Sequence, residues 1–522
     1  MHFTSFDRRR LLLAGAGALA GCASAAAQPV SATGDPAADA EFREFADRLA
    51  QRTPSARPFL LRRFDATRLT PQGRVLYDAV GPGAEAEAAL AQSAWGNFGV
   101  PYAVTSRNGA YRRAAELNPA DDLRIALREV NRDTNRLEAD AAAGVIAPDF
   151  AIDAVIPEVE AAAQRVAASG EERHASLVDA LNRQADVLRA QRARASTDAG
   201  VWRLPGGEEF YANTLQLQLG APVDPREAHR EALEHCRALQ RETDTLLRRQ
   251  GLTSGSVGDR LRTLARDPRY LTGTDEDGAT RALLDMGACL SRIRSLFCDV
   301  IPEAASITTT PAEVGRLPRA QEANGTAGRR TGNAYLIDLG APRPSWTLPS
   351  VVHHELIPGH ILQNYFLYRS EPLELQARYA SGYGEGWAIY AEQLADDVGA
   401  FADDPLGRIG YLQWMLFRYG RIVADTGINA MRWSRERAIT EMRALQGDSI
   451  AFVSIEDDVL RFCVQPGVYT AQALAARHIA DLRERTRHMR GFTMARFHEA
   501  VLRYGPLSPP GLTQAVRAAF AA

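Results

Sequence analysis

The stretch VVHHELIPGH, residues 351–360, places three of the chain's ten histidines within eight positions and sets a glutamate among them. In the usual zinc-protease element, HExxH, two histidines at i and i+4 share a helix face and bind Zn²⁺, and the glutamate, here Glu355, is the general base. In this chain six positions separate His354 from His360, and six residues turn an ideal helix through roughly 600°, which leaves the two rings on different faces. An unbroken helix over this stretch therefore cannot bring His354 and His360 to the same metal ion.

Two residues between the histidines offer a break in that helix. Pro358 removes a backbone hydrogen bond and clashes with the carbonyl four residues earlier, so the helix must open or kink. Gly359 permits dihedral angles that let the chain enter a new helix with a changed phase. The sequence thus predicts a broken turn that brings His360 back toward His354. His353 is the competing ligand by phase, but it lies about two turns from His360.

A third ligand is needed if one coordination position is to remain open for water. SGYGEGWAIYAEQLADD, residues 381–397, supplies Glu385, which follows a flexible GYG and opens an aromatic, amphipathic helix. Glu392 lies seven residues further on, on the same face two turns later, and is the fallback ligand. Without the histidine cluster, both glutamates could equally be charged residues on the solvent-exposed face of a helix. The predicted cofactor is one Zn²⁺ per chain, held by His354, His360 and Glu385.

The composition excludes several classes of protein. All 61 basic residues are arginine, because the 522-residue chain contains no lysine. A P-loop needs a lysine at the phosphates, a pyridoxal-phosphate enzyme needs one for its Schiff base, and a protein kinase needs its strand lysine. The formal net charge of −3 gives no reason to expect nucleic acid as a partner. These classes are therefore excluded, and we expect no nucleic-acid partner.

The N-terminus has the pattern of an export signal. DRRRLLLAGAGALAGC, residues 7–22, carries adjacent arginines, an apolar run too short to span a bilayer, and small residues before Cys22. The arginines resemble a twin-arginine signal, and LAGC resembles the lipobox of bacterial lipoproteins. We predict a signal peptide over residues 1–21, a lipidated tether over residues 22–40, and a lipid-anchored location on the periplasmic side of the bacterial cell envelope. A plain secretory signal with an incidental cysteine is the alternative.

From about residue 40 onward, helical periodicity dominates the chain. One amphipathic stripe at i, i+4, i+8 and i+11 consists of Leu177, Leu181, Ala185 and Leu188. Asp224 before a proline is typical of a helix start. NAYLIDLG, residues 333–340, is the best strand candidate and lies just before the histidine cluster. These patterns predict a mainly α, mostly helical domain over residues 41–522, with a small β element beside the metal-site region, residues 331–522.

Four segments occur in an order that resembles a known bacterial family, the domain of unknown function 885 (DUF885). They are LPSVVHHELIPGHILQ (348–363), GYGEGWAIYAEQLADDVG (382–399), RYGRIVADTGINAMRWSRERAI (418–439) and FTMARFHEAVLRYGPLSPPGL (492–512). The family resembles zinc metallopeptidases of the HExxH type with a glutamate third ligand. The resemblance implies a zincin-like peptidase fold with two helical lobes around a channel. It also implies His354, His360 and Glu385 as ligands, with Glu355 as the base.

Two positions depart from the family pattern. The family tends to have histidine where this chain has Asn429, and tyrosine where it has Gln472. Such side chains in zinc peptidases often donate hydrogen bonds to the developing oxyanion, and asparagine and glutamine can also donate. Tyr469 lies one helical turn before Gln472 and could supply a hydroxyl group. Asn429, Gln472 and Tyr469 are therefore candidate catalytic residues.

Three charged residues in RYGRIVADTG share one predicted helix face: Arg418, Arg421 and Asp425. The two arginines are candidates for binding a substrate carboxylate or for orienting a metal ligand. An ion pair between Arg421 and Asp425, at i and i+4, is the alternative.

The predicted function is zinc-dependent hydrolysis of peptide or related amide bonds in short or unfolded peptides, by metal-activated water with Glu355 as general base. The alternative is a catalytically weak or inactive envelope lipoprotein that binds peptides, which Asn429 and Gln472 leave open. A serine hydrolase is disfavoured because the chain contains no G-x-S-x-G elbow.

Overall fold

The computed structural model describes residues 34–116, 123–168, 174–307, 314–317, 328–448 and 453–520. The predicted signal peptide and Cys22 lie outside these segments. Helix α2 (Pro36–Ala50) begins within the stretch assigned to the tether. It starts there because the Asp35 carboxylate accepts a hydrogen bond from the backbone N–H of Ala37 and because Pro36 occupies the first helical position.

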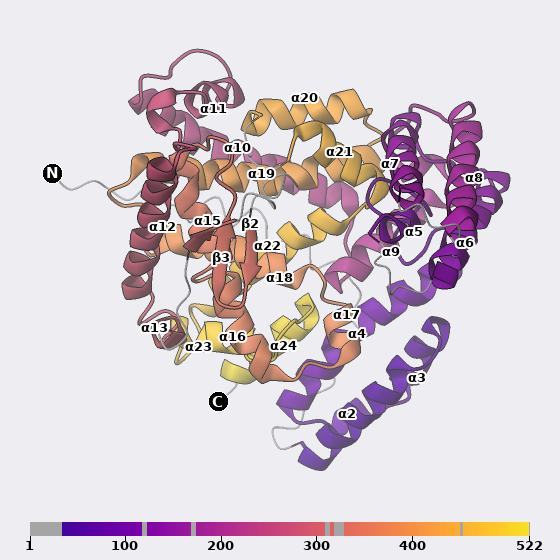
Figure 1. Ribbon diagram of the computed structural model, residues 1–522. Helices are drawn as coiled ribbons and strands as arrows, with labels where there is room; N and C mark the ends of the chain where they lie inside the picture. The colour runs from indigo at the N-terminus through magenta and orange to yellow at the C-terminus, as the bar shows by residue number, and fades with distance from the viewer. Residues whose placement is uncertain are drawn as a thin grey trace.

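In the described segments before the sheet, helices are the dominant elements (Figure 1). After α2 they are α3 (Arg57–Arg62), α4 (Pro71–Leu90), α5 (Ala110–Ala114), α6 (Leu123–Ala142), α7 (Asp149–Ala167), α8 (Ala175–Arg192), α9 (Gly207–Leu219), α10 (Pro225–Arg249), α11 (Val257–Ala265), α12 (Glu276–Leu296) and α13 (Glu303–Ser306). Helix α8 packs on α6 and α7, and it buries all four residues of the predicted stripe. Asp224 caps α10, as predicted.

A small sheet follows these helices. Its strands β1 (Val314–Arg316), β2 (Gly328–Thr331) and β3 (Ala334–Ile337) have the order β1-β3-β2, with β1 parallel and β2 antiparallel to β3. Strand β3 lies within the predicted strand segment. Helix α12 packs on β1 and on α15 (Leu348–Glu355), so the sheet lies beside the histidine cluster, as expected (Figure 1).

The remaining helices carry the candidate site and the centre of the core. They are α15, α16 (His360–Ser370), α17 (Glu374–Arg378), α18 (Tyr383–Asp397), α19 (Pro405–Asn429), α20 (Arg435–Gln446), α21 (Ile455–Val464), α22 (Val468–Thr486), α23 (Met494–Leu502) and α24 (Pro509–Phe520). From Ile409 to Asn429 every residue of α19 is buried. The helix packs on α10, α15, α18, α20, α21 and α22, so it forms the centre of this part of the molecule.

The prediction of a mainly α fold with a small β element near the site is confirmed. The arrangement of two lobes around a channel stays a prediction. Within the described segments, no helix combines the length and the apolar character that crossing a bilayer requires.

Candidate metal centre

The helix that begins at Leu348 breaks between the two histidines, as the sequence predicts. Helix α15 ends at Glu355, and α16 begins at His360. At Leu356 the backbone leaves the helical region, with φ −107° and ψ −98°. The Leu356 carbonyl then accepts hydrogen bonds from the backbone N–H groups of Ile361 and Leu362, at 3.2 and 3.4 Å. The chain thus closes one helix, turns, and opens a second helix directly at His360.

Gly359 and Trp387 hold this turn in place. A Cβ atom on Gly359 would lie 1.8 Å from the carbonyl oxygen of His354, so only glycine fits where the chain passes over the first histidine. The indole N–H of Trp387, on α18, donates a hydrogen bond of 2.9 Å to the carbonyl of Pro358. This bond fastens the buried turn to the helix that carries Glu385.

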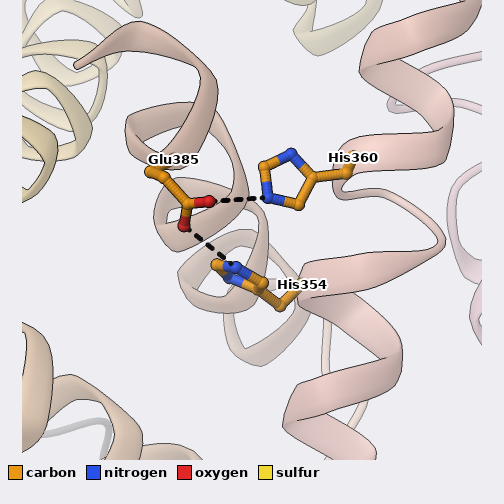
Figure 2. Close-up of side chains that lie close together, drawn as sticks. All are labelled: His354, His360 and Glu385. Carbon is orange, nitrogen blue, oxygen red and sulfur yellow. Dashed lines mark ion pairs between the residues drawn. The ribbon is translucent and has the colours of Figure 1, made fainter. Parts of the chain in front are cut away.

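Glu385 lies in the first turn of α18 and faces both histidines (Figure 2). Its two carboxylate oxygens lie 3.3 Å from Nε2 of His354 and 3.4 Å from Nε2 of His360. One ligand atom from each of the three residues lies within 4.8 Å of the other two. The side chains of the histidines are 8% and 6% exposed, and that of Glu385 is 34% exposed. The cluster is therefore buried on the histidine side and reaches solvent on the glutamate side.

Hydrogen bonds at the far side of each ring fix which nitrogen faces the cluster. Nδ1 of His354 lies 2.9 Å from a carboxylate oxygen of Glu392, whose second oxygen accepts a hydrogen bond of 3.1 Å from the Ser350 hydroxyl. Nδ1 of His360 lies 3.3 Å from Oε1 of Gln363. Because both partners are acceptors, each Nδ1 carries the proton in the neutral ring, and each Nε2 presents a lone pair to the cluster. This is the arrangement that a metal ligand requires.

Without a cation, the cluster holds a proton. Burial and the Arg418 cation act to lower the pKa of His354, but hydrogen bonds to Glu385 and Glu392 outweigh them and raise it to about 9. Removal from water opposes ionisation of Glu385, yet hydrogen bonds with both histidines hold its pKa well below the usual range. His354 and Glu385 thus form an imidazolium–carboxylate pair, whose proton a metal ion would displace.

The donor set fits zinc. Two imidazoles and one carboxylate leave one position of a tetrahedral ion open, as in catalytic zinc sites. Nε2 of His360 is buried, and its contact with the Glu385 carboxylate, at 3.4 Å, is a long one. A bound cation would satisfy this buried nitrogen. We therefore identify His354, His360 and Glu385 as the residues that could hold the ion.

His353, the competing ligand, points elsewhere. It is 1% exposed, its ring packs edge-on against Phe401, and its Nε2 lies 3.9 Å from the sulfur of Cys289 on α12. Burial lowers its pKa to about 3, so it is neutral. The structure therefore assigns His353 to the core.

Glu355, the predicted base, follows His354 at the end of α15. Its carboxylate accepts a hydrogen bond of 2.5 Å from the guanidinium of Arg330 on β2, and its side chain is 20% exposed. No sequence signal linked Arg330 to the site, because strand β2 is short and exposed along most of its length.

The three charged residues of α19 have separate roles. Arg421 donates two hydrogen bonds of 2.8 Å to Asp458 on α21. Asp425 accepts hydrogen bonds from the backbone N–H of Gly467 and the hydroxyl of Thr470. The alternative ion pair between Arg421 and Asp425 is therefore wrong, because each residue has a partner on another element. Arg421 is held by Asp458, whereas Arg418 lies at the cluster.

In the described part of the chain, none of the predicted oxyanion donors hydrogen-bonds to the three cluster residues. Asn429 is fully buried, and its amide group donates to Asp425 and to the Phe462 carbonyl while accepting from the backbone N–H of Val201. It has no donor left for a substrate, because these bonds hold the end of α19 in place.

Tyr469 and Gln472 both lie on α22. Tyr469 packs against the guanidinium of Arg421, which lies 4.3 Å from its ring centre. The backbone of Gln472 lies beside Gly386, where α22 crosses α18. Among the residues that the structure describes, the hydrogen bonds and ion pairs of the cluster involve neither side chain.

Two supporting residues were not predicted in their actual roles. Glu392 was the fallback ligand, and the structure makes it the partner of a ligand. Gln363 lies one turn after His360, a spacing that could have indicated the contact.

Residues 18–516 match a family model described as bacterial protein of unknown function (DUF885). The chain belongs to this family. No curated protein matches this DUF885 chain.

Two solved structures share the fold of this DUF885 chain. A candidate lipoprotein from Colwellia psychrerythraea is 22% identical, with a TM-score of 0.70, covering 92% of this chain and 89% of its own. A candidate lipoprotein of unknown function from Shewanella oneidensis is 19% identical, with a TM-score of 0.57, covering 93% of each chain. At these identities the similarity shows the fold alone.

Proposed function

We propose that this DUF885 protein is a zinc-dependent hydrolase that cleaves peptide or related amide bonds in short or unfolded peptides. The observation that carries the proposal is the convergence of His354, His360 and Glu385, with both Nε2 atoms aimed at one carboxylate. The Glu392 carboxylate behind His354 is a feature typical of metal sites.

Zinc in this position would polarise a scissile carbonyl and lower the pKa of a bound water molecule to about 7. The chain supplies the proton transfers. Glu355 accepts the proton of the attacking water and delivers it to the leaving amine. Arg330 donates to one oxygen of this carboxylate, Oε2, so the proton of the water molecule would go to the other oxygen. Ser350 and Glu392 hold His354 in orientation throughout.

We also propose a location in the cell envelope. Two structures of the same fold are described as candidate lipoproteins, and the N-terminal sequence carries a signal-peptide pattern ending at Cys22. Lipid on this cysteine would attach the protein to the membrane.

A second function, peptide binding without cleavage, is favoured by one observation. Asn429, at the position where the family tends to have histidine, has no hydrogen-bond donor to offer an oxyanion. Losing one such donor typically costs about 10²- to 10³-fold in rate.

Metal analysis combined with cleavage of a peptide library tests the proposal. We expect one zinc per chain, and cleavage that stops on chelation and returns with added zinc. Glu355→Gln should retain zinc while cleavage falls about 10²- to 10⁴-fold, since it removes only the proton acceptor. Glu234→Gln, at an exposed site on α10, is the matched control and should cleave normally. Bound zinc with no cleavage of any peptide would favour the binding function, and undiminished cleavage by Glu355→Gln would remove this residue as the base.

A further inference from the structure

Arg418 places a buried guanidinium against the candidate metal centre. The residue lies on α19 and is 7% exposed. Its Nη2 lies 3.3 Å from Nδ1 and 3.4 Å from Nε2 of His354, so the group sits over the face of that ring. The same nitrogen is 3.6 Å from the Glu392 carboxylate. Arg418 is therefore adjacent to the ligand atom that faces Glu385.

The guanidinium of Arg418 has an N–H group without an acceptor. A guanidinium carries five N–H donors, and burying them without acceptors is costly. Nε of Arg418 is buried and has no hydrogen-bond partner in the described segments. Arg421, one turn further along the same helix, donates hydrogen bonds from Nε and Nη2 to the two carboxylate oxygens of Asp458. Of these two neighbouring arginines, Arg418 is the one that lies at the cluster and has a buried Nε without an acceptor in the described segments.

A divalent cation would change the net charge of the centre from negative to positive. Glu385 and Glu392 contribute two negative charges and Arg418 one positive charge, while Glu355 and Arg330 neutralise each other. With neutral histidines, a divalent cation would leave one positive charge unbalanced in a mostly buried site. An anionic group on the substrate would balance it. The planar fork of a guanidinium matches carboxylates and phosphates, and the anionic group common to unblocked peptides is the α-carboxylate.

We propose that Arg418 binds a substrate carboxylate, so that the preferred substrates are peptides with a free α-carboxylate next to the scissile amide. This inference rests on the proposed hydrolase function and makes the enzyme a carboxypeptidase or dipeptidase. Water adds across the C–N bond, its hydroxyl joining the acyl carbon and its proton joining the amine, and the C-terminal amino acid leaves. Arg418 takes no proton and acts on binding and orientation.

The test compares matched peptides with a free C-terminal acid and with a C-terminal amide. We expect the wild-type protein to prefer the acid by about 10- to 100-fold in kcat/KM, mainly through KM, since a charge-assisted contact is lost with the amide. In Arg418→Gln this preference should collapse, and in Arg418→Lys it should survive in part. Zinc content should be unchanged. Arg503→Gln, at an exposed site on α23's C-terminal end, is the matched control and should keep the preference.

A binding measurement keeps the test decisive if the variants fold poorly. By calorimetry, N-acetyl-phenylalanine should bind the zinc-loaded wild-type protein at least about 10-fold more tightly than its amide. Equal cleavage or equal binding of acid and amide would overturn the role of Arg418 and leave the hydrolase proposal intact. Absence of zinc-dependent cleavage of both peptides would instead overturn the proposed function.

Discussion

At the scale of single residues, Glu392 shows how one carboxylate changes role with its surroundings. Its spacing from Glu385 made it a possible ligand, yet it is 1% exposed and is hydrogen-bonded to Ser350 and to the outer nitrogen of His354. A carboxylate in that position fixes the ring and raises its basicity toward a metal. Glu392 therefore supports the site from behind.

Glu392→Gln should lower zinc affinity by about 10- to 100-fold, because the amide is a weaker acceptor for the N–H of His354. The affinity can be measured by competition with a fluorescent chelator. Ser350→Ala, which removes only the contact behind Glu392, should have a smaller effect. If Glu392→Gln holds zinc as tightly as the wild-type protein, the glutamate has no role in orienting the histidine.

At the scale of elements, the break between α15 and α16 is what brings the two histidines together. The chain crosses the carbonyl of His354 at Gly359, and there is no space for a side chain. Gly359→Ala should therefore abolish zinc binding and lower the free energy of unfolding by at least about 2 kcal/mol. Metal analysis and denaturant unfolding measure the two effects.

Gly287→Ala is the matched control for this substitution. Gly287 lies within α12, and a Cβ atom there would meet nothing within 4 Å. Alanine in a helix interior is more favourable than glycine by about 1 kcal/mol, so this variant should be slightly more stable and should bind zinc normally. A Gly359→Ala protein with full zinc content would show that the turn tolerates a side chain.

The features that could be predicted from the sequence are those that depend on residues close together along the chain. The stripe in α8, the Asp224 cap and the break at Pro358 and Gly359 are local patterns, and all appear in the structure. The pairing of Arg421 with Asp458 could not be predicted, because the partner is 37 positions away on another helix. Asn429 was misplaced for the same reason, since its contacts with Val201 and Phe462 exist only after α19 is enclosed.

At the scale of the whole molecule, His498 joins three distant segments. It lies on α23, is fully buried, and its ring nitrogens contact the carbonyl of Val300 and the hydroxyl of Tyr390 on α18. Burial lowers the pKa of His498 to about 3, and the nearby Arg483 cation acts in the same direction. The ring is therefore neutral in the folded protein throughout the neutral and mildly acidic range.

This depressed pKa predicts acid sensitivity. In the unfolded chain histidine titrates near pH 6.5. The contribution of neutral His498 to the free energy of unfolding is therefore fully present above that pH and is lost as the pH falls toward 3. Between pH 6.5 and 5 the loss from this group should be about 2 kcal/mol. Denaturant unfolding of wild type and His498→Gln at both pH values should show a shallower pH dependence in the variant. The exposed His488→Gln is the control, and equal slopes in all three proteins would contradict the assignment.

The enclosure of α19 has a consequence for anyone who divides this protein. Its partners come from both directions along the chain, α10 and α15 before it and α20 to α22 after it. A fragment that ends before Pro405 lacks the central helix α19. A fragment that begins at Pro405 contains α19 but exposes the apolar surface that α10 and α15 cover in the intact chain. Split reporters, domain swaps and inserted tags should therefore not interrupt the helices between residues 225 and 486 that pack on α19.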